Sequence, residues 1–255
     1  MLGAHADAAA SSDFKPTMNA ITASLTAIWT SSIGKKLIVA LTGAFLVLFL
    51  AGHLVGNLLV FVGREAFNDY AYFLHHMVHG AGIWLFRAIM ISALVLHVAA
   101  TISLTLQNRA ARKPYECQSV IQATISSRNM IWSGLTLLAF FIYHMLHFTL
   151  RVGNQYSTYV DPEHLAKTQL ERHDAWKMVI DGFSNGWVTL FYVIAMTLLC
   201  SHLSHGVASI FQTLGLRFKK SEGVLRCLSL GYALVIWVGF ISIPLAILVF
   251  GFGKA

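Results

Sequence analysis

The chain alternates between long apolar runs and short polar segments. Five runs reach the roughly 20 mostly apolar residues that a helix needs to cross a bilayer. They are expected at residues 37–62, 81–106, 130–150, 186–211 and 227–252. A helix satisfies its own backbone hydrogen bonds, as a segment in lipid requires. The pattern predicts an all-α membrane protein whose domain, residues 31–255, is a bundle of five transmembrane helices, with Pro244 expected to kink the fifth.

The segments between the runs carry their own signals. Residues 1–30 lack the apolar core of a signal peptide and are expected to form a separate cytoplasmic N-terminal segment, with an interfacial helix over 18–30. Residues 63–80 look amphipathic. The segment 161–183 should open with a helix that Asp161 caps, because proline follows in its first turn.

Composition supports a membrane location. Of the 255 residues, 56% are hydrophobic and 11% are charged, whereas soluble domains are about 45–50% apolar and about 25% charged. The net charge of +7 forms no stripe of the kind that binds nucleic acid, and no nucleic-acid partner is expected. Basic residues gather in alternate loops, which predicts a cytoplasmic N-terminus and an external C-terminus. The three widely spaced cysteines are expected to be free thiols: Cys117, Cys200 and Cys227.

Histidines are the unusual polar residues within the runs. Six are expected inside the spans: His53, His97, His144, His147, His202 and His205. A single such histidine is explained by an interhelical hydrogen bond worth about 1 kcal/mol. At 1.5 Å per residue, however, His53 and His144 share a depth roughly 10–14 Å from the outer edge. His97 and His202 share a second depth nearer the inner side.

Two imidazoles that face each other at one depth can ligate a haem iron from both sides. A zinc ion would instead require three or four ligands, usually with cysteine or carboxylate among them, and the spans contain no aspartate or glutamate. The pattern therefore predicts two haems b, one at each depth. Three arginines near span ends are candidates for haem propionate contacts or for simple snorkelling at the interface: Arg87, Arg128 and Arg151.

Four of the histidines form two pairs, and the members of each pair are three residues apart. His147 follows His144, and His205 follows His202. Such residues diverge by about 60° around a helix. Both members of a pair therefore cannot be axial ligands of the same iron. The spacing leaves open which member is the ligand.

Four histidine motifs, in order, resemble a known family. They are "LAGHLVGNLLVF" around His53, "ALVLHVAAT" around His97, "WSGLTLLAFFIYHMLHFT" around His144 and "CSHLSHGVASIFQTLG" around His202. Over residues 30–252 the chain resembles the five-helix, di-haem cytochrome b subunit of succinate:quinone oxidoreductases, a type also found in quinol:fumarate reductases. The resemblance implies that His53 and His144 ligate a distal haem, and that His97 and His202 ligate a proximal haem. It leaves His147 and His205 as neighbours that do not ligate iron, and His147 is a candidate partner for a propionate or quinone oxygen.

The resemblance also implies a function. The chain would anchor complex II in a bacterial inner membrane and pass electrons between an iron–sulfur subunit and a quinone, as the quinone-reducing part of an enzyme. Two-haem members of the family often use menaquinone, which is therefore the expected quinone. A flavoprotein with FAD and an iron–sulfur subunit would dock on the cytoplasmic face. Five residues of the first outer loop are quinone-site candidates that match no motif: Glu65, Asp69, His75, His76 and His79.

Other functions stay open at this point. The same anchor could work in the reverse direction, in a quinol:fumarate reductase. A di-haem anchor of a formate dehydrogenase or hydrogenase is disfavoured, because such anchors usually have four spans. A membrane protein without haem, whose histidines only pack, would make the matched depths a coincidence. Membrane lipid is an expected partner, and assembly of the complex into a higher oligomer stays open.

Overall fold

The computed structural model describes residues 17–111, 129–218 and 220–254, and these residues form an all-helical structure. Within these ranges, five helices are long and apolar enough to span a membrane, in agreement with the five predicted spans. The elements are α1 (Thr17–Thr30), α2 (Ser32–Leu58), η1 (Leu59–Phe61), α3 (Arg64–His76), α4 (Ala81–Ala110), α6 (Met130–His144), η2 (Met145–Thr149), η3 (Tyr156–Thr158), α7 (Pro162–Thr168), α8 (Ala175–Ser184), α9 (Gly186–Thr213) and α10 (Glu222–Phe250).

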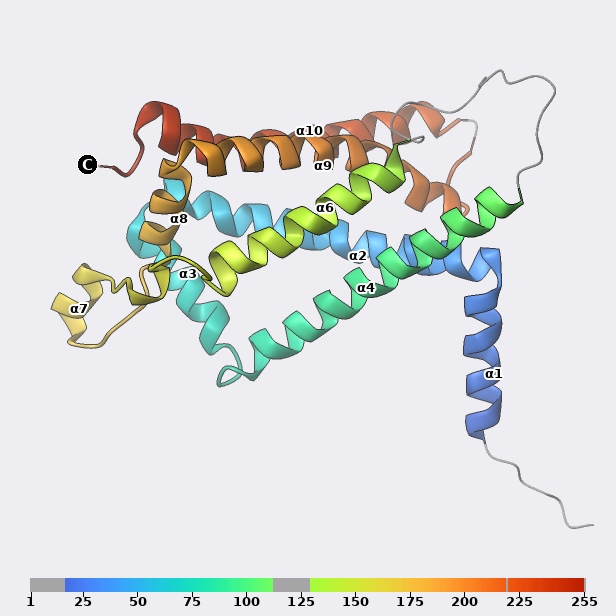
Figure 1. The fold of residues 1–255 in the computed structure, drawn as a ribbon, viewed down its shortest axis with the longest axis horizontal. Helices are drawn as coiled ribbons and strands as arrows, with labels where there is room; N and C mark the ends of the chain where they lie inside the picture. The colour runs from blue at the N-terminus through green and yellow to red at the C-terminus, as the bar shows by residue number, and fades with distance from the viewer. Residues whose placement is uncertain (1–16, 112–128, 219, 255) are drawn as a thin grey trace, which may run out of the picture.

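The long helices lie along a common direction, and α1 leaves one end of the bundle nearly at right angles to them (Figure 1). Ser31 caps α2 by accepting a hydrogen bond from the Gly34 amide at 2.8 Å. A Cβ atom at Gly34 would lie 2.1 Å from the carbonyl oxygen of Ile28, so only glycine permits this corner. The helix predicted at 18–30 is therefore present and runs across the bundle axis. Its position at a membrane interface stays a prediction.

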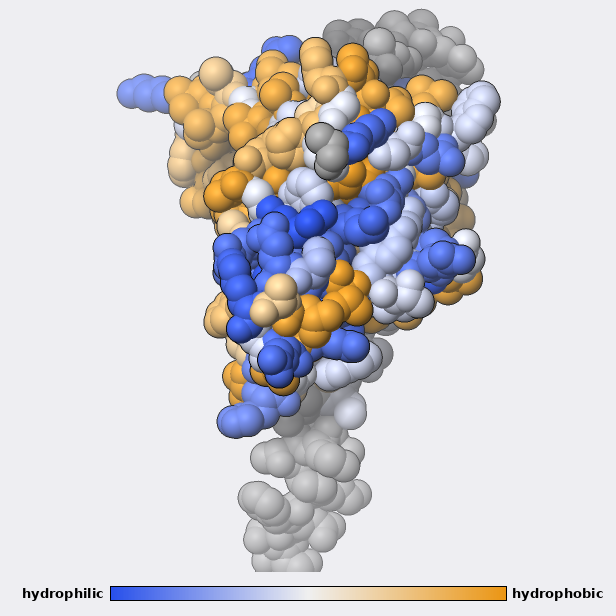
Figure 2. Space-filling view, turned by 90° about the vertical axis from the view of Figure 1, so that its left-hand side faces the viewer, coloured by the Kyte–Doolittle hydropathy of each residue, from blue (hydrophilic) through white to orange (hydrophobic). Residues whose placement is uncertain are grey.

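Short helices cover the opposite end of the bundle, where α3, α7 and α8 lie (Figure 1). We call this the α8 end, and the other the α1 end. Hydrophilic residues gather across the centre of the α8 end, with hydrophobic residues above them (Figure 2). The predicted cap is confirmed: Asp161 accepts hydrogen bonds from the amides of Glu163 and His164, and Pro162 begins α7.

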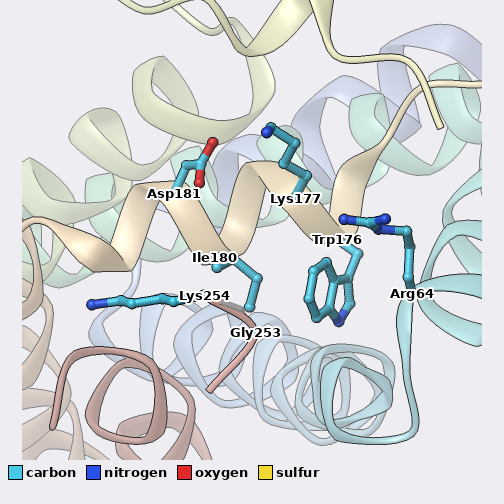
Figure 3. Close-up of a pocket in the computed structure, with 7 residues that line it drawn as sticks. All are labelled: Arg64, Trp176, Lys177, Ile180, Asp181, Gly253 and Lys254. Carbon is cyan, nitrogen blue, oxygen red and sulfur yellow. The ribbon is translucent and has the colours of Figure 1, made fainter. Parts of the chain in front are cut away.

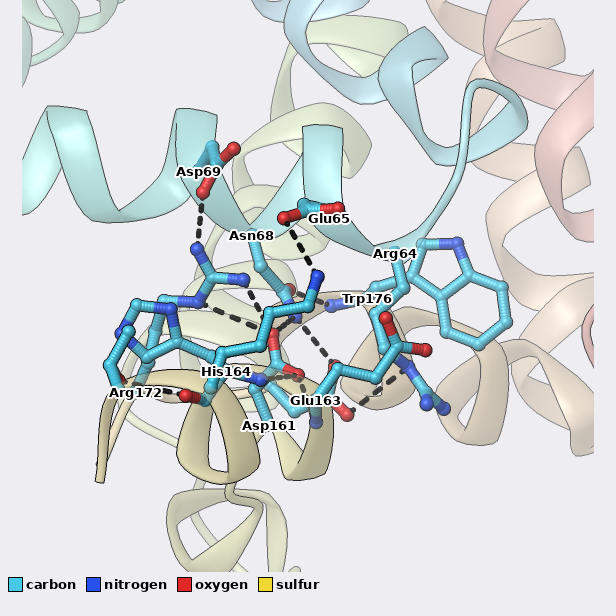
Figure 4. A network of polar contacts seen from close by, with 12 residues as sticks. Arg64, Glu65, Asn68, Asp69, Asp161, Glu163, His164, Arg172 and Trp176 are labelled. Carbon is cyan, nitrogen blue, oxygen red and sulfur yellow. Dashed lines mark hydrogen bonds and ion pairs between the residues drawn. The ribbon is translucent and has the colours of Figure 1, made fainter. Parts of the chain in front are cut away.

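A polar clasp joins the covering segments to one another (Figure 4). We use this name for Asn68, Asp69, Asp161, Arg172 and Asp174. Arg172 donates to Asp161 at 2.6 Å, and Asn68 donates to both Asp161 and Asp174 at 2.9 and 3.0 Å. Arg172 also forms an ion pair with Asp69. Burial raises the pKa of Asp161, but the hydrogen bonds from Arg172 and Asn68 outweigh it and hold the pKa at about 2.

The five long helices differ in how much of their surface is buried. A buried cluster of Leu54, Leu203, Ala233 and Ile236 joins α2, α9 and α10, and α10 continues through Pro244. In the most apolar stretch of α9 and of α10, 28% of residues are buried, against 6% in those of α4 and α6. The helices that carry His97 and His144 therefore lie against less protein than α9 and α10 do.

Candidate functional site

The structure brings His53 of α2 and His144 of α6 together. Their ring centroids lie 5.9 Å apart and the ring planes are nearly perpendicular, at 83°. Two imidazoles on opposite sides of one metal ion, each with a metal–nitrogen bond of about 2 Å, place their centroids roughly 6 Å apart. The spacing therefore suits a pair of axial ligands. We call this pair the His53 level.

The second pair, His97 of α4 and His202 of α9, lies nearer the α1 end, and the two side chains are within electrostatic range of each other. We call it the His97 level. Each ring is held by a hydroxyl group on another helix: Nδ1 of His97 lies 3.1 Å from Oγ1 of Thr42, and Nδ1 of His202 lies 3.1 Å from Oγ of Ser133.

These hydroxyl groups select the tautomer of the two rings. Thr42 donates its proton to the carbonyl oxygen of Ile38 at 2.6 Å, and Ser133 donates to that of Met130 at 3.1 Å. A hydroxyl group has one proton, so each oxygen can only accept from its histidine. Both rings therefore carry hydrogen on Nδ1, and the lone pair of Nε2 is available to a metal. Metal-binding histidines characteristically donate their other ring N–H in this way.

The same spacing links the two levels on α2 and on α6. Thr42 precedes His53 by eleven positions, and Ser133 precedes His144 by eleven positions. Eleven residues make about three turns, so both members of each pair face the same side of the helix, roughly 16 Å apart along its axis. This repeated spacing of a hydroxyl group and a histidine was not predicted, although it is visible in the sequence.

Tyr192 joins the doubled histidines of α6 and η2. Its buried hydroxyl group lies 3.2 Å from Nδ1 of His144 and 3.2 Å from Nδ1 of His147. A phenol has one proton, so it donates to one ring and accepts from the other. His147 is therefore linked to the His53 level through Tyr192, a residue that the sequence analysis did not single out.

The helix that carries both histidines widens after His144. Residues 145–149 form a π-helical turn, in which the amide of Leu150 donates to the carbonyl oxygen of Met145 at 2.8 Å. This corrects the expectation of a regular α-helix over 130–150, because α6 ends at His144. Single π turns occur mostly at functional sites. Asn154 supports the turn by donating to the carbonyl oxygen of His147 at 3.2 Å.

His53 and His205 are held less firmly. The amide nitrogen of Asn57 donates to the carbonyl oxygen of His53 at 2.7 Å and lies 3.3 and 3.4 Å from the two ring nitrogens, so it selects neither. His205 lies within electrostatic range of His202, and its carbonyl oxygen accepts from Ser209. His205 is thus placed beside the His97 level, as a neighbour of its ligand candidate.

Two arginines and two histidines gather at the α8 end beyond the His53 level. Arg87 interacts electrostatically with His75 and Arg151, and Arg151 with His173. Burial first, and then the charges of Arg87 and Arg151, lower the pKa of His75, while burial and Arg151 lower that of His173. Within the described chain, Nε of Arg151 and Nε2 of His173 are buried without a hydrogen-bond partner. We call these four residues the basic cluster.

The basic cluster has the properties of an anion site. Arg151 adopts a positive φ of 57°, which is strained for a residue other than glycine. Its orphaned Nε would gain a partner from a carboxylate, as a haem propionate would provide. The structure thus gives Arg87 and Arg151 a shared place, whereas Arg128, the third predicted contact, lies outside the described residues.

Glycines lie beside the histidines of both levels. A Cβ atom at Gly43 would lie 3.2 Å from the ring of His97, and one at Gly134 would lie 3.5 Å from the ring of His202. Next to His53, a Cβ atom at Gly52 would meet no described atom within 4 Å, so that side of α2 is open. Gly56 instead packs on Tyr70, which a Cβ atom would approach to 2.5 Å.

The acidic quinone-site candidates lie away from the histidine levels. Asp69 belongs to the polar clasp, and Glu65 pairs with Lys167 on the exposed surface. His75 belongs to the basic cluster, His76 stacks on Tyr72 with ring centroids 3.7 Å apart, and His79 lies in the turn before α4 with a φ of 55°. Cys200 and Cys227 are free thiols, as predicted, and Cys117 lies outside the described residues.

In residues 17–111, 129–218 and 220–254, no three His, Cys, Asp or Glu side chains gather to hold a metal ion. No family model matches the chain, and neither the curated proteins nor the solved structures contain a match. The fold itself is that of a multi-pass membrane protein with five apolar helices.

Proposed function

We propose that this chain is the membrane anchor and electron-transfer subunit of a succinate:quinone oxidoreductase, with two haems b. The observation that carries the proposal is the arrangement of four histidines from four helices at two levels. His53 and His144 have the spacing of two ligands of one iron, and the hydroxyl groups beside Nδ1 of His97 and His202 leave Nε2 of each ring free to ligate. The resemblance of the four motifs supplies the identity of the complex.

Bound haem would supply one-electron transfer, and the residues of this chain would set its position and environment. Thr42 and Ser133 fix the rings of His97 and His202 by accepting their Nδ1 protons. If His144 ligates through Nε2, its Nδ1–H points to Tyr192, and the hydroxyl proton of Tyr192 then points to His147. His147 thus acts on the ligand through Tyr192 and is not itself a ligand.

The basic cluster would bind the propionates of the haem at the His53 level. The orphaned Nε of Arg151 is buried where an anion would complete its hydrogen bonds. A quinone would exchange electrons with this level, and the iron–sulfur subunit with the His97 level. The FAD and iron–sulfur clusters of the complex would belong to its partner subunits, docked at the α1 end on the cytoplasmic side.

A reduced-minus-oxidised visible spectrum of the purified full chain tests the proposal. We expect a b-type α band and two haems per chain by pyridine haemochrome assay. His205→Ala, which removes a neighbour and no ligand, serves as the control and should keep both haems. A chain that is folded and carries no haem when it is produced with haem supplied contradicts the proposal.

A further inference from the structure

A cavity of about 350 Å³ lies at the α8 end, apart from the histidine levels (Figure 3). Arg64 at the start of α3, Trp176 and Lys177 of α8, and Lys254 after α10 all line it. With Asp181, the lining has three cationic side chains and one carboxylate. The carboxylate is partly engaged, because it is hydrogen-bonded to Tyr159. The cavity is therefore suited to an anion.

Specific contacts hold the side chains of the cavity walls in place. The guanidinium group of Arg64 lies 4.9 Å from the centroid of the Trp176 ring, and Trp176 donates from Nε1 to the carbonyl oxygen of Val60 at 3.0 Å. Nε of Arg64 forms an ion pair with the buried Asp174 at 3.5 Å, which leaves the terminal nitrogens of the guanidinium group for another partner. A cation held on an aromatic face with unused donor capacity is ready for a further partner.

The C-terminal turn places Lys254 by close packing. Gly253 has a φ of 74°, and a Cβ atom there would lie 2.7 Å from both Trp176 and Ile180. The amide of Lys254 donates to the carbonyl oxygen of Gly251 at 3.2 Å, which folds the turn back onto α8. The lysine thus stands beside the cavity because the turn is fixed there.

The position of the cavity along the bundle indicates the kind of anion. Arg64 follows the span that ends at Phe61, and Lys254 follows the span that ends at Phe250. Apolar side chains at the ends of these two spans are exposed: Phe250 is 82% exposed, and Val62, which follows Phe61, is 71% exposed. Cations directly beyond exposed apolar residues match the depth at which phospholipid phosphates lie.

We propose that this cavity binds a phosphate-bearing anion at the membrane surface, of the chemistry that an anionic phospholipid head group carries. The proposal does not depend on haem or on the proposed function. Lys177 and Lys254 would neutralise the phosphate, and Arg64 would donate to its oxygens from its place over Trp176. The exposed Val62 and Phe250 would lie beside the acyl chains.

Native mass spectrometry of the full chain from nanodiscs tests the lipid source. With equal phosphatidylglycerol and phosphatidylcholine of the same acyl chains, we expect the protein to retain phosphatidylglycerol at least about fivefold over phosphatidylcholine. Lys177→Gln and Lys254→Gln should each reduce that preference about fivefold, since one basic residue near an anionic surface contributes about 1 kcal/mol. Neither lysine is buried, so the variants should fold.

Lys167→Gln is the matched control, because it removes an exposed lysine of the same end from α7, outside the cavity. Titration of the detergent-purified chain with inorganic phosphate tests the soluble source by thermal shift. Stabilisation by phosphate that Lys254→Gln abolishes, without a lipid preference, supports a free phosphate as ligand. No preference and no stabilisation overturn the proposal, as does an equal loss in Lys167→Gln.

Discussion

The two histidine levels are built differently. At the His97 level, hydroxyl groups whose protons are already engaged hold both rings, so the hydrogen of each ring is fixed on Nδ1. At the His53 level, Tyr192 shares one proton between His144 and His147, and Asn57 selects neither nitrogen of His53. The His97 level therefore has a single hydrogen-bond arrangement, whereas the His53 level has two.

The residues that surround the two histidine levels also differ. Aromatic rings crowd the His53 level, where Phe49 and Phe240 contact His53 and Phe140 contacts His144. The basic cluster and the polar clasp lie beyond it. Glycine and hydroxyl side chains surround the His97 level instead. The comparison indicates a rigid site near the α1 end and an adjustable site near the α8 end.

The largest expected effect comes from removing one ring of each level. On the proposed function, His97→Ala should abolish one haem and His53→Ala the other, because a haem held by two histidines would lose its binding site with either of them. Haem content and the difference spectrum of each purified variant measure this. We expect the two variants to leave spectrally distinct haems. Loss of the same haem from both would contradict the assignment of these histidines to separate levels.

The polar clasp should affect the His53 level before the His97 level. Arg172→Met leaves the buried Asp161 without its ion-pair partner, which typically costs about 3–5 kcal/mol. Thermal unfolding, followed separately at each haem band, should show the His53-level band lost at the lower temperature. Lys167→Gln, whose ion pair with Glu65 is exposed, should change little.

Acid should reproduce this order in the unaltered chain. The pKa of Asp161 is about 2 in the fold, below the ordinary carboxyl value of ~4. The clasp therefore contributes its full stability above about pH 4 and loses it as the pH falls toward about 2. Melting curves between neutral pH and about pH 3 should show the decline, and Asp161→Asn should flatten it. A simultaneous loss of both bands would refute the order.

The hydroxyl groups of the His97 level should control haem affinity. Thr42→Val removes the acceptor of His97, and loss of such a partner typically costs about 10–100-fold in metal affinity. Haem-transfer titrations on the purified chain measure it. Thr105→Val is the control, because the Thr105 hydroxyl group bonds within α4, to the carbonyl oxygen of Thr101. Equal affinities in the two variants would remove the role assigned to Thr42.

The smallest effect is expected at Tyr192. Tyr192→Phe should leave haem bound but shift the midpoint potential of the His53-level haem by roughly 60 mV, the shift that a tenfold change in relative affinity gives in a one-electron couple. The His97-level haem should not move. Tyr143→Phe is the control, because it removes a hydroxyl group from a neighbouring ring that stacks on His147. A shift in both haems would show that Tyr192 acts on the whole bundle.

Sequence patterns predicted the parts of the fold that depend on local composition. The five spans follow from apolar length, and the Asp161 cap follows from an aspartate before a proline. The π turn of η2 was not predicted from local composition. The residues that form hydrogen bonds with it, Tyr192 and Asn154, lie in other segments. The polar clasp likewise joins Asn68 to Asp161 and Asp174, which lie 93 and 106 residues further along the chain.

The candidate site was predictable only in outline. Depth matching grouped His53 with His144, and the structure places their rings together. The partners of the rings were not predicted, since serine, threonine and tyrosine are common in apolar helices and only their distances distinguish them. The arginines were predicted as separate contacts, whereas Arg87 and Arg151 form one cluster with two histidines.

The eleven-residue spacing on α2 and α6 has a mechanical consequence. Because both helices place a hydroxyl group and a histidine three turns apart, the two levels have the same separation on both sides of the bundle. Sliding α2 past α6 by one turn would therefore misalign both levels at once, and restoring one would restore the other. Binding of a ligand at one level would fix the register of α2 and α6. That register would also align the residues of the second level, so the second ligand would meet a site that is already formed.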